Sequence, residues 1–66
     1  MTIGEAIKRA RERRGYSQAK LSMKSGISMQ SISLWETGRT FPTIINLIPV
    51  ADALNVTLDE LVGRSK

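Results

Sequence analysis

The stretch of sequence that decides the fold is SQAKLSMKSGISMQSISLWETG, residues 17–38. It contains two short segments whose apolar residues recur with a helical spacing, and a three-residue connection, Gly26-Ile27-Ser28, lies between them. Ser17 and Ser28 each stand directly before one of the two segments. A serine in this position accepts a hydrogen bond from a backbone N–H of the first turn and so favours the start of a helix. The stretch therefore predicts two short helices joined by a tight turn.

Glycines mark where the two helices should end. Gly26 follows the first segment and Gly38 follows the second. Because glycine readily takes the left-handed conformation that terminates a helix, we expect helices over about 18–25 and 29–37. Two such helices, joined by a three-residue turn that contains glycine, are typical of the helix-turn-helix motif, whose second helix enters the major groove of DNA.

Three further helices are predicted outside this motif. Thr2 with Glu5, and Thr57 with Glu60, have the spacing of a capping box, in which two residues satisfy each other's backbone N–H groups. Thr43 stands before a further apolar segment. The expected ranges of these helices are about 3–14, 44–54 and 58–62. Since no stretch alternates between apolar and polar residues as a strand does, the sequence predicts an all-α, compact five-helix bundle.

Residues 1–66 are expected to form a single domain around one small core. Trp35 stands three residues after Ile32, so both should face inward from the helix over 29–37. The helical spacing also predicts an inward stripe on the helix over 44–54: Ile44, Leu47, Ile48, Ala51 and Leu54. A chain of this length buries only about 60% of the surface that its unfolded form exposes, so few residues must supply the core.

The composition excludes several classes of function. The 66 residues include no cysteine and no histidine, which removes disulfides, thiolate metal sites and the commonest general base. The six carboxylates are explained by caps, ion pairs or solvent exposure, so we expect neither an enzyme nor a cofactor. No apolar run approaches the roughly 20 residues of a membrane span, and no small-molecule site is evident. A reducing cytoplasm fits this composition.

Charge is distributed unevenly along the chain. The net charge is +4; residues 1–41 hold eight Lys or Arg and three Asp or Glu, giving +5, whereas residues 42–66 hold two and three, giving −1. A basic first part indicates a polyanionic partner. A solvated basic surface with no such partner would have the same composition, so charge alone leaves both interpretations open.

The order and spacing of several motifs resemble a known family. The matching stretches are Ser17-Gln18-x-x-Leu21, Gly26-Ile27-Ser28, Ser31-Ile32-Ser33-x-Trp35-Glu36-x-Gly38, Pro42-Thr43 and Ala53-Leu54-Asn55-Val56-Thr57-Leu58-Asp59-Glu60-Leu61. Over about residues 3–62 the chain is similar to the lambda-repressor-like, Cro-type helix-turn-helix regulators of bacteria and phages. The resemblance implies a sequence-specific regulator of transcription, expected to be a repressor, that binds double-stranded DNA as a homodimer at the bacterial nucleoid.

The resemblance also implies which residues meet DNA. Phosphate contacts are expected from Gln18, at the start of the first motif helix, and from Arg39 and Thr40, in the loop after the second. The outward residues of the second motif helix are expected to read bases: Met29, Gln30, Ser33 and Leu34. The Gln30 amide can pair with adenine through two hydrogen bonds, whereas the apolar side chains can pack on a thymine methyl group.

Two charged residues are assigned to the fold and not to DNA. In the family that the chain resembles, Arg11 and Glu36 form a partly buried salt bridge that locks the first helix to the third. We therefore expect this pair to contribute to stability and count neither residue as a DNA contact.

The homodimer is expected to use the outer face of the helix over 44–54 and the helix over 58–62. Ile45 and Pro49 lie four residues apart and outside the inward stripe, so an apolar pair faces away from the core. Pro49 also removes the hydrogen bond to the Ile45 carbonyl and should bend the helix there. From the last helix, the resemblance adds three residues: Leu58, Leu61 and Val62.

A protein-interaction module on the same scaffold is the alternative function. An antitoxin-like or adaptor protein would use exposed Met29 and Leu34, or the surface of the helix over 44–54, to contact another protein. Salt separates the two functions, because phosphate-driven binding weakens steeply with ionic strength and apolar contact does not.

Overall fold

The computed structural model describes residues 2–63, and that part of the chain contains five α-helices and no strand. The helices are α1 (Ile3–Arg13), α2 (Gln18–Ser25), α3 (Met29–Glu36), α4 (Ile44–Leu54) and α5 (Leu58–Val62). The prediction of an all-α, five-helix fold is confirmed. Of the expected span 1–66, Met1 and residues 64–66 lie outside the described residues. None of the described helices is both long enough and apolar enough to span a membrane.

Every helix begins after a residue with a hydroxyl side chain, and that hydroxyl accepts a hydrogen bond from the N–H three positions later. The five residues are Thr2, Ser17, Ser28, Thr43 and Thr57. The helices over Ile3–Arg13 and Leu58–Val62 also have complete capping boxes, with Glu5 and Glu60 as the reciprocal partners. These starts are determined within four residues of sequence, because the donor and the acceptor of each cap lie that close together.

The helix ends differ slightly from the expected ranges. Arg14 and Thr37 are capping residues after α1 and α3, so each helix is one residue shorter than expected. Gly26 has φ 78° after α2, and Asn55 takes the left-handed conformation after α4 with φ 56°. Pro49 lies inside α4, which continues to Leu54.

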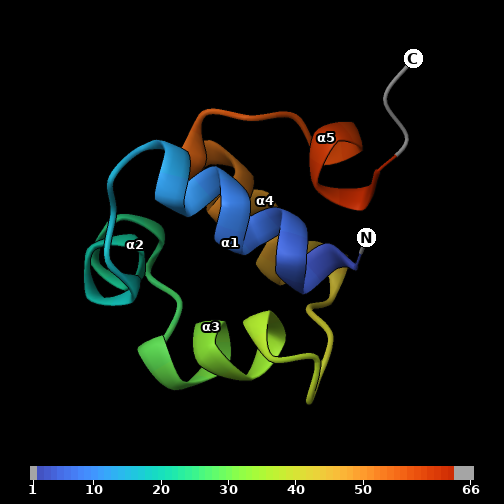
Figure 1. Ribbon diagram of the computed structural model, residues 1–66, viewed down its shortest axis with the longest axis horizontal. Helices are drawn as coiled ribbons and strands as arrows, with labels where there is room; N and C mark the ends of the chain where they lie inside the picture. Colours follow the sequence, from blue (N-terminus) through green and yellow to red (C-terminus); the bar gives the residue numbers. More distant parts are fainter. Residues whose placement is uncertain (1, 64–66) are drawn as a thin grey trace.

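The helices are arranged around α1, which crosses the middle of the molecule (Figure 1). Helix α1 packs against α3 on one side and α5 on another, while α4 packs against α2 and α5. Helices α2 and α3 also pack against each other. The helix-turn-helix pair therefore rests on a support formed by α1 and α4.

The core is small, and all five helices contribute to it. Six side chains are almost completely buried: Ile7, Leu21, Ile32, Val50, Leu54 and Leu61. Trp35 is 5% exposed, so the indole lies in the core as its spacing from Ile32 predicts. The core explains how so short a chain folds without disulfides, since each helix buries at least one large apolar side chain.

The expected inward stripe of α4 is wrong at two positions. Ile44 and Ile48 are 58% and 46% exposed, and Val50 is buried instead. The buried residues of α4 are Leu47, Val50, Ala51 and Leu54, so the inward face is centred closer to Val50 than the expected stripe. Helical spacing permits both faces, and packing against α2 and α5 selects between them.

Gly4 allows α1 and α3 to approach closely. A Cβ atom at this position would lie 1.8 Å from the Trp35 carbonyl oxygen and 2.7 Å from the Trp35 carbonyl carbon. These are backbone atoms, which cannot turn away as a flexible side chain can. The first turn of α1 therefore contacts the last turn of α3 backbone to backbone, and only glycine fits at this contact.

Candidate nucleic-acid interface

The turn between α2 and α3 is fixed by side-chain hydrogen bonds. Ser22 Oγ donates to the Ile27 carbonyl over 2.6 Å, and the Ile27 N–H donates to Ser25 Oγ over 3.2 Å. Gly26 supplies the left-handed residue between them. Two half-buried serines of α2 thus hold the start of α3, which sets the direction in which α3 leaves the turn.

The first turns of α2 and α3 have the same capping arrangement. Ser17 Oγ accepts from Lys20 N, and Ser28 Oγ accepts from Ser31 N, over 3.0 and 3.1 Å. The first two N–H groups of each helix, at residues 18–19 and 29–30, have no hydrogen-bond acceptor within the described part of the chain. Free N–H groups and the positive end of the helix dipole attract anions, so both termini are suited to phosphate oxygens.

The four expected base readers differ in exposure. Met29 is 50% exposed and Gln30 is exposed, whereas Ser33 and Leu34 are half-buried. The side chain of Leu34 is therefore less available to a base than its outward position on the helix predicts, and Met29 and Gln30 form the most accessible part of α3.

The loop after α3 is anchored on one carbonyl group. The Leu34 carbonyl oxygen accepts from Arg39 N at 2.9 Å, from Thr40 N at 3.4 Å and from Thr37 Oγ1 at 3.2 Å. Thr37 Oγ1 also lies 3.1 Å from the Ser33 carbonyl oxygen. Arg39 and Thr40 are exposed. Both expected phosphate-binding residues of the loop are thus attached by their backbone to α3.

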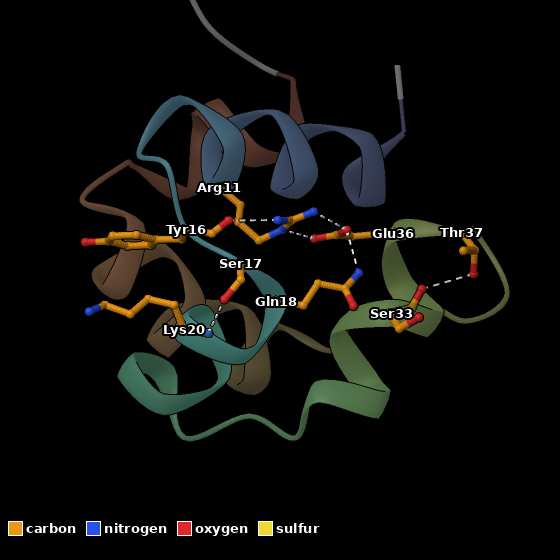
Figure 2. Close-up of polar contacts among 8 residues, drawn as sticks. All are labelled: Arg11, Tyr16, Ser17, Gln18, Lys20, Ser33, Glu36 and Thr37. Atoms are coloured by element: carbon orange, nitrogen blue, oxygen red, sulfur yellow. Dashed lines mark hydrogen bonds and ion pairs between the residues drawn. The ribbon is translucent and has the colours of Figure 1, made fainter.

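Arg11, Glu36 and Gln18 form one polar network that joins three helices (Figure 2). Arg11 Nε donates to Glu36 Oε2 over 2.8 Å, and Arg11 Nη2 donates to Glu36 Oε1 over 3.0 Å. Gln18 Nε2 donates to Glu36 Oε1 over 3.0 Å, and Arg11 Nη1 donates to the Tyr16 carbonyl over 2.8 Å. The side chains of Arg11 and Glu36 are 11% and 3% exposed. The structure thus brings the expected ion pair together and adds Gln18 to it.

The network stabilises the charged form of Arg11. The side-chain hydrogen bonds to Glu36 hold the pKa of Arg11 above its ordinary value, and the charge of Glu36 acts in the same direction against the opposing effect of burial. The guanidinium group therefore stays ionised in the folded protein at every ordinary pH.

Arg14 makes a contact that the sequence analysis does not predict. Its Nε donates to the Leu54 carbonyl over 2.8 Å and so joins the end of α1 to the end of α4. A cation at the C-terminal end of a helix is favourable, because the last carbonyl groups are free and the dipole is negative there. The two residues are 40 positions apart, so local sequence signals could not have indicated this contact.

The five residues expected at a dimer interface are not equally available. Ile45 is 76% exposed and Val62 is 38% exposed, whereas Pro49 and Leu58 are half-buried. Leu61 is a correction, because it is 2% exposed and packed in the core of its own chain. Its side chain cannot contact a second subunit without leaving that core.

Two further isoleucines of α4 are exposed beside Ile45. Ile44, Ile45 and Ile48 are all exposed, and their spacing places them on one side of the helix. We call this surface the isoleucine face. It has no charged member, in a chain whose net charge is +4.

Comparison with known proteins agrees with this geometry. The chain is 39% identical over 64 residues to the cryptic phage CTXphi transcriptional repressor RstR of Vibrio cholerae, covering 97% of this chain and 57% of that protein. It is 40% identical over 60 residues to the HTH-type transcriptional regulator y4dJ of Sinorhizobium fredii, covering 91% and 78%. The match covers 52% and 44% of the length of two further regulators, so the chain spans about half the length of several curated relatives.

A solved structure matches over nearly the whole chain. It is the crystal structure of the P22 c2 repressor in complex with the synthetic operator 9T in the presence of Tl+. The two chains superpose with a TM-score of 0.89 and are 32% identical in sequence, and the match covers 98% of each chain. The family model described as helix-turn-helix matches residues 7–61. These matches confirm the resemblance drawn from the sequence motifs. The chain belongs to the helix-turn-helix family of the lambda-repressor and Cro type.

Proposed function

We propose that this protein is a sequence-specific, double-stranded DNA-binding repressor that acts as a homodimer in the bacterial cytoplasm, at the nucleoid. One observation carries the proposal: the chain matches the P22 c2 repressor, in a complex with an operator, over 98% of both chains. The basic first part of the chain and the free N–H groups of α2 and α3 support it further.

In this proposal α3 enters the major groove and reads base edges. The exposed amide of Gln30 pairs with adenine, and the exposed side chain of Met29 packs on a thymine methyl group. Ser33 and Leu34 lie further along α3 and are half-buried, so they offer the bases a smaller contact surface. Such a surface reads few bases through hydrogen bonds, so the preferred site should be rich in A·T pairs at the contacts of α3.

Phosphate contacts fix the register of α3 in the groove. Gln18 at the start of α2 contacts one phosphate, and Arg39 and Thr40 contact another. Because the Leu34 carbonyl holds the backbone of both loop residues, the loop follows every displacement of α3. A phosphate bound by the loop therefore determines how far α3 lies along the groove.

Selection from a random pool of duplexes at physiological salt tests the proposal. We expect an enriched site with two-fold symmetry, whose affinity falls steeply as salt rises. Absence of any enriched sequence would overturn the proposal and favour the protein-interaction module, antitoxin-like or adaptor. Binding of another protein with an affinity that does not change with salt would also favour the protein-interaction module.

We further propose that two copies meet through the isoleucine face, Pro49 and the exposed edge of α5 with Leu58 and Val62. An uncharged surface suits contact between two copies of a basic chain, since it brings no like charges together. The surface consists of only six side chains, whereas a stable complex buries roughly 800 Å² per partner, so the dimer should be weak without DNA. A symmetric pair would set the two copies of α3 about 34 Å apart, one turn of DNA.

Replacing Arg39 with alanine should weaken binding about equally for all DNA sequences. The substitution removes a cation from the phosphate-binding loop, so fewer counterions are released on binding. The slope of log affinity against log salt should fall by roughly one unit. Titration of the selected duplex and of an unrelated duplex at several salt concentrations measures this slope.

Gln30→Ala is the matched control, because it removes a neutral base contact from α3. It should relax the preference at one base position, lose about 1–3 kcal/mol on the preferred site, and leave the salt slope unchanged. The assignment of Arg39 is wrong if its slope is also unchanged. The assignment of Gln30 is wrong if its loss is equal for every sequence.

Ile45→Lys should abolish cooperative binding to the two half-sites without unfolding the protein. A lysine at a position 76% exposed remains solvated in the monomer, but in a symmetric dimer it brings two positive charges into an apolar contact. Binding isotherms and the mass of the complex measure the effect, and Ile45→Val, which keeps an apolar side chain at the same position, is the control. Unchanged cooperativity would move the interface to α5, and a wild-type monomer on a single half-site would contradict the dimer.

A further inference from the structure

The carboxylate of Glu36 is shared between two partners with different roles. Arg11, the expected structural partner, makes hydrogen bonds to both oxygens, of 2.8 Å to Oε2 and 3.0 Å to Oε1. Gln18, which is expected to contact DNA, donates its Nε2 to the same Oε1 over 3.0 Å. Figure 2 shows Gln18 reaching from the start of α2 to Glu36, which lies between it and Arg11. The ion pair and the phosphate-binding helix start are thus directly connected.

The chemistry of this hydrogen bond determines how the Gln18 amide is oriented. An ionised carboxylate only accepts hydrogen bonds, so the amide must turn its NH2 group and not its oxygen toward Glu36. One N–H is then used, and the planarity of the amide fixes the direction of the second N–H. Gln18 is half-buried, so part of its side chain remains accessible to a ligand.

We infer that Glu36 is a positioning residue for DNA binding: it holds the Gln18 amide so that the second N–H donates to a phosphate oxygen. The same phosphate lies beside the free backbone N–H groups at the start of α2. A phosphate oxygen is an acceptor, so an amide turned the other way would present an oxygen to it and repel it. This inference rests on the proposed DNA-binding function.

The role goes beyond the stability that the ion pair gives the fold. Without Glu36, Gln18 would be an ordinary surface glutamine with several rotamers, and binding DNA would have to order it. With Glu36 in place, the side chain is ordered before DNA arrives. Arg11 keeps the carboxylate in position from α1, so it acts on Gln18 only through Glu36.

A double-mutant cycle on the duplex selected from the random pool tests this inference. Gln18→Ala removes the donor, and Glu36→Ala removes both oxygens that could accept a hydrogen bond from it. We expect each single variant to lose affinity by about tenfold, the size of one hydrogen bond to a charged group. The double variant should lose no more than Gln18→Ala alone, because both changes remove the same contact. Glu12→Gln, at an exposed position of α1, is the control and should leave the affinity unchanged in both backgrounds.

The salt slope distinguishes this contact from a purely ionic one. Because an amide carries no charge, Gln18→Ala should leave the slope unchanged while the affinity falls. Independent, multiplicative losses in the cycle would overturn the positioning role and leave the proposed function intact. An unchanged affinity of Gln18→Ala would overturn the phosphate contact of this residue as well. A wild-type protein that selects no duplex would instead contradict the proposed function itself.

A measurement on the unaltered protein covers the case in which Glu36→Ala does not fold. In the free protein, one side-chain amide proton of Gln18 should already be shifted in a ¹⁵N–¹H spectrum by its bond to the carboxylate. Addition of the selected duplex should shift the second proton and leave the first in place. Two amide protons at the positions of a solvated glutamine in the free protein would overturn the inference.

Discussion

Gly4→Ala should destabilise the protein by about 3 kcal/mol, the upper end of the cost of overpacking a core. The added Cβ would lie 1.8 Å from the Trp35 carbonyl oxygen, so α1 and α3 must separate along their contact. Alanine favours a helix over glycine by about 1 kcal/mol, but this gain is smaller than the loss of packing. Since a domain of this size has only about 3–10 kcal/mol of stability in total, the substitution should remove from about a third of that stability to all of it.

Thermal unfolding followed by circular dichroism measures the change, and Gly15→Ala is the matched control. Gly15 has φ 73° but open space around its Cβ position, so alanine there meets only the backbone strain of about 1–2 kcal/mol. The Tm of Gly4→Ala should fall on the order of 10–20 °C, well below that of the control. A Tm for Gly4→Ala at or above that of Gly15→Ala would show that α1 and α3 are not in backbone contact.

Glu36→Ala should have an effect of similar size for an electrostatic reason. The substitution leaves the guanidinium group of Arg11, whose side chain is 11% exposed, without its carboxylate. Breaking a fully buried pair costs about 3–5 kcal/mol, and because this pair is only mostly buried we expect about 3 kcal/mol. Glu12→Ala removes an exposed carboxylate from α1 and should cost well under 1 kcal/mol.

Urea or thermal unfolding of both variants measures this difference, and equal midpoints would show that the pair is solvated.

The stabilisation by Arg11 should persist through the neutral and mildly alkaline range. Its folded pKa is raised, so this contribution is fully present below the ordinary pKa of arginine and is lost only as the pH rises through the higher folded value. An Arg11→Met and Glu36→Leu double variant should be more stable than Glu36→Ala, because it leaves no unpaired charge.

The features that sequence predicts best are those determined within a few neighbouring residues. The start of each helix follows from a hydroxyl cap and N–H groups two or three positions away, as at Ser17 and Ser28. The left-handed end of α2 follows from Gly26 alone. Family resemblance supplies what local signals cannot, such as the pairing of Arg11 with Glu36 across 25 positions.

The features that sequence predicts poorly depend on how helices meet. The apolar segment of α4 permits two inward faces, and only packing shows that Val50 is buried and Ile44 is not. A leucine at an interface and a leucine in a core look the same in the sequence, but Leu61 belongs to the core of its own chain. The sequence does not mark Gly4 as a contact, because a glycine inside a helix is tolerated at a cost of about 1 kcal/mol relative to alanine without any close approach of another helix.

The distribution of the six almost completely buried side chains over all five helices has a consequence for the motions of the domain. Ile32 anchors α3 in the same core that Leu61 of α5 and Ile7 of α1 complete. No helix can detach without exposing its share of that core, so the domain should open as a single cooperative unit. Backbone amides deep in α3 should then exchange with solvent as slowly as those of α1, only through global unfolding. In the proposed complex α3 would therefore meet the groove as a preformed rod, and binding would carry no cost of folding the helix first.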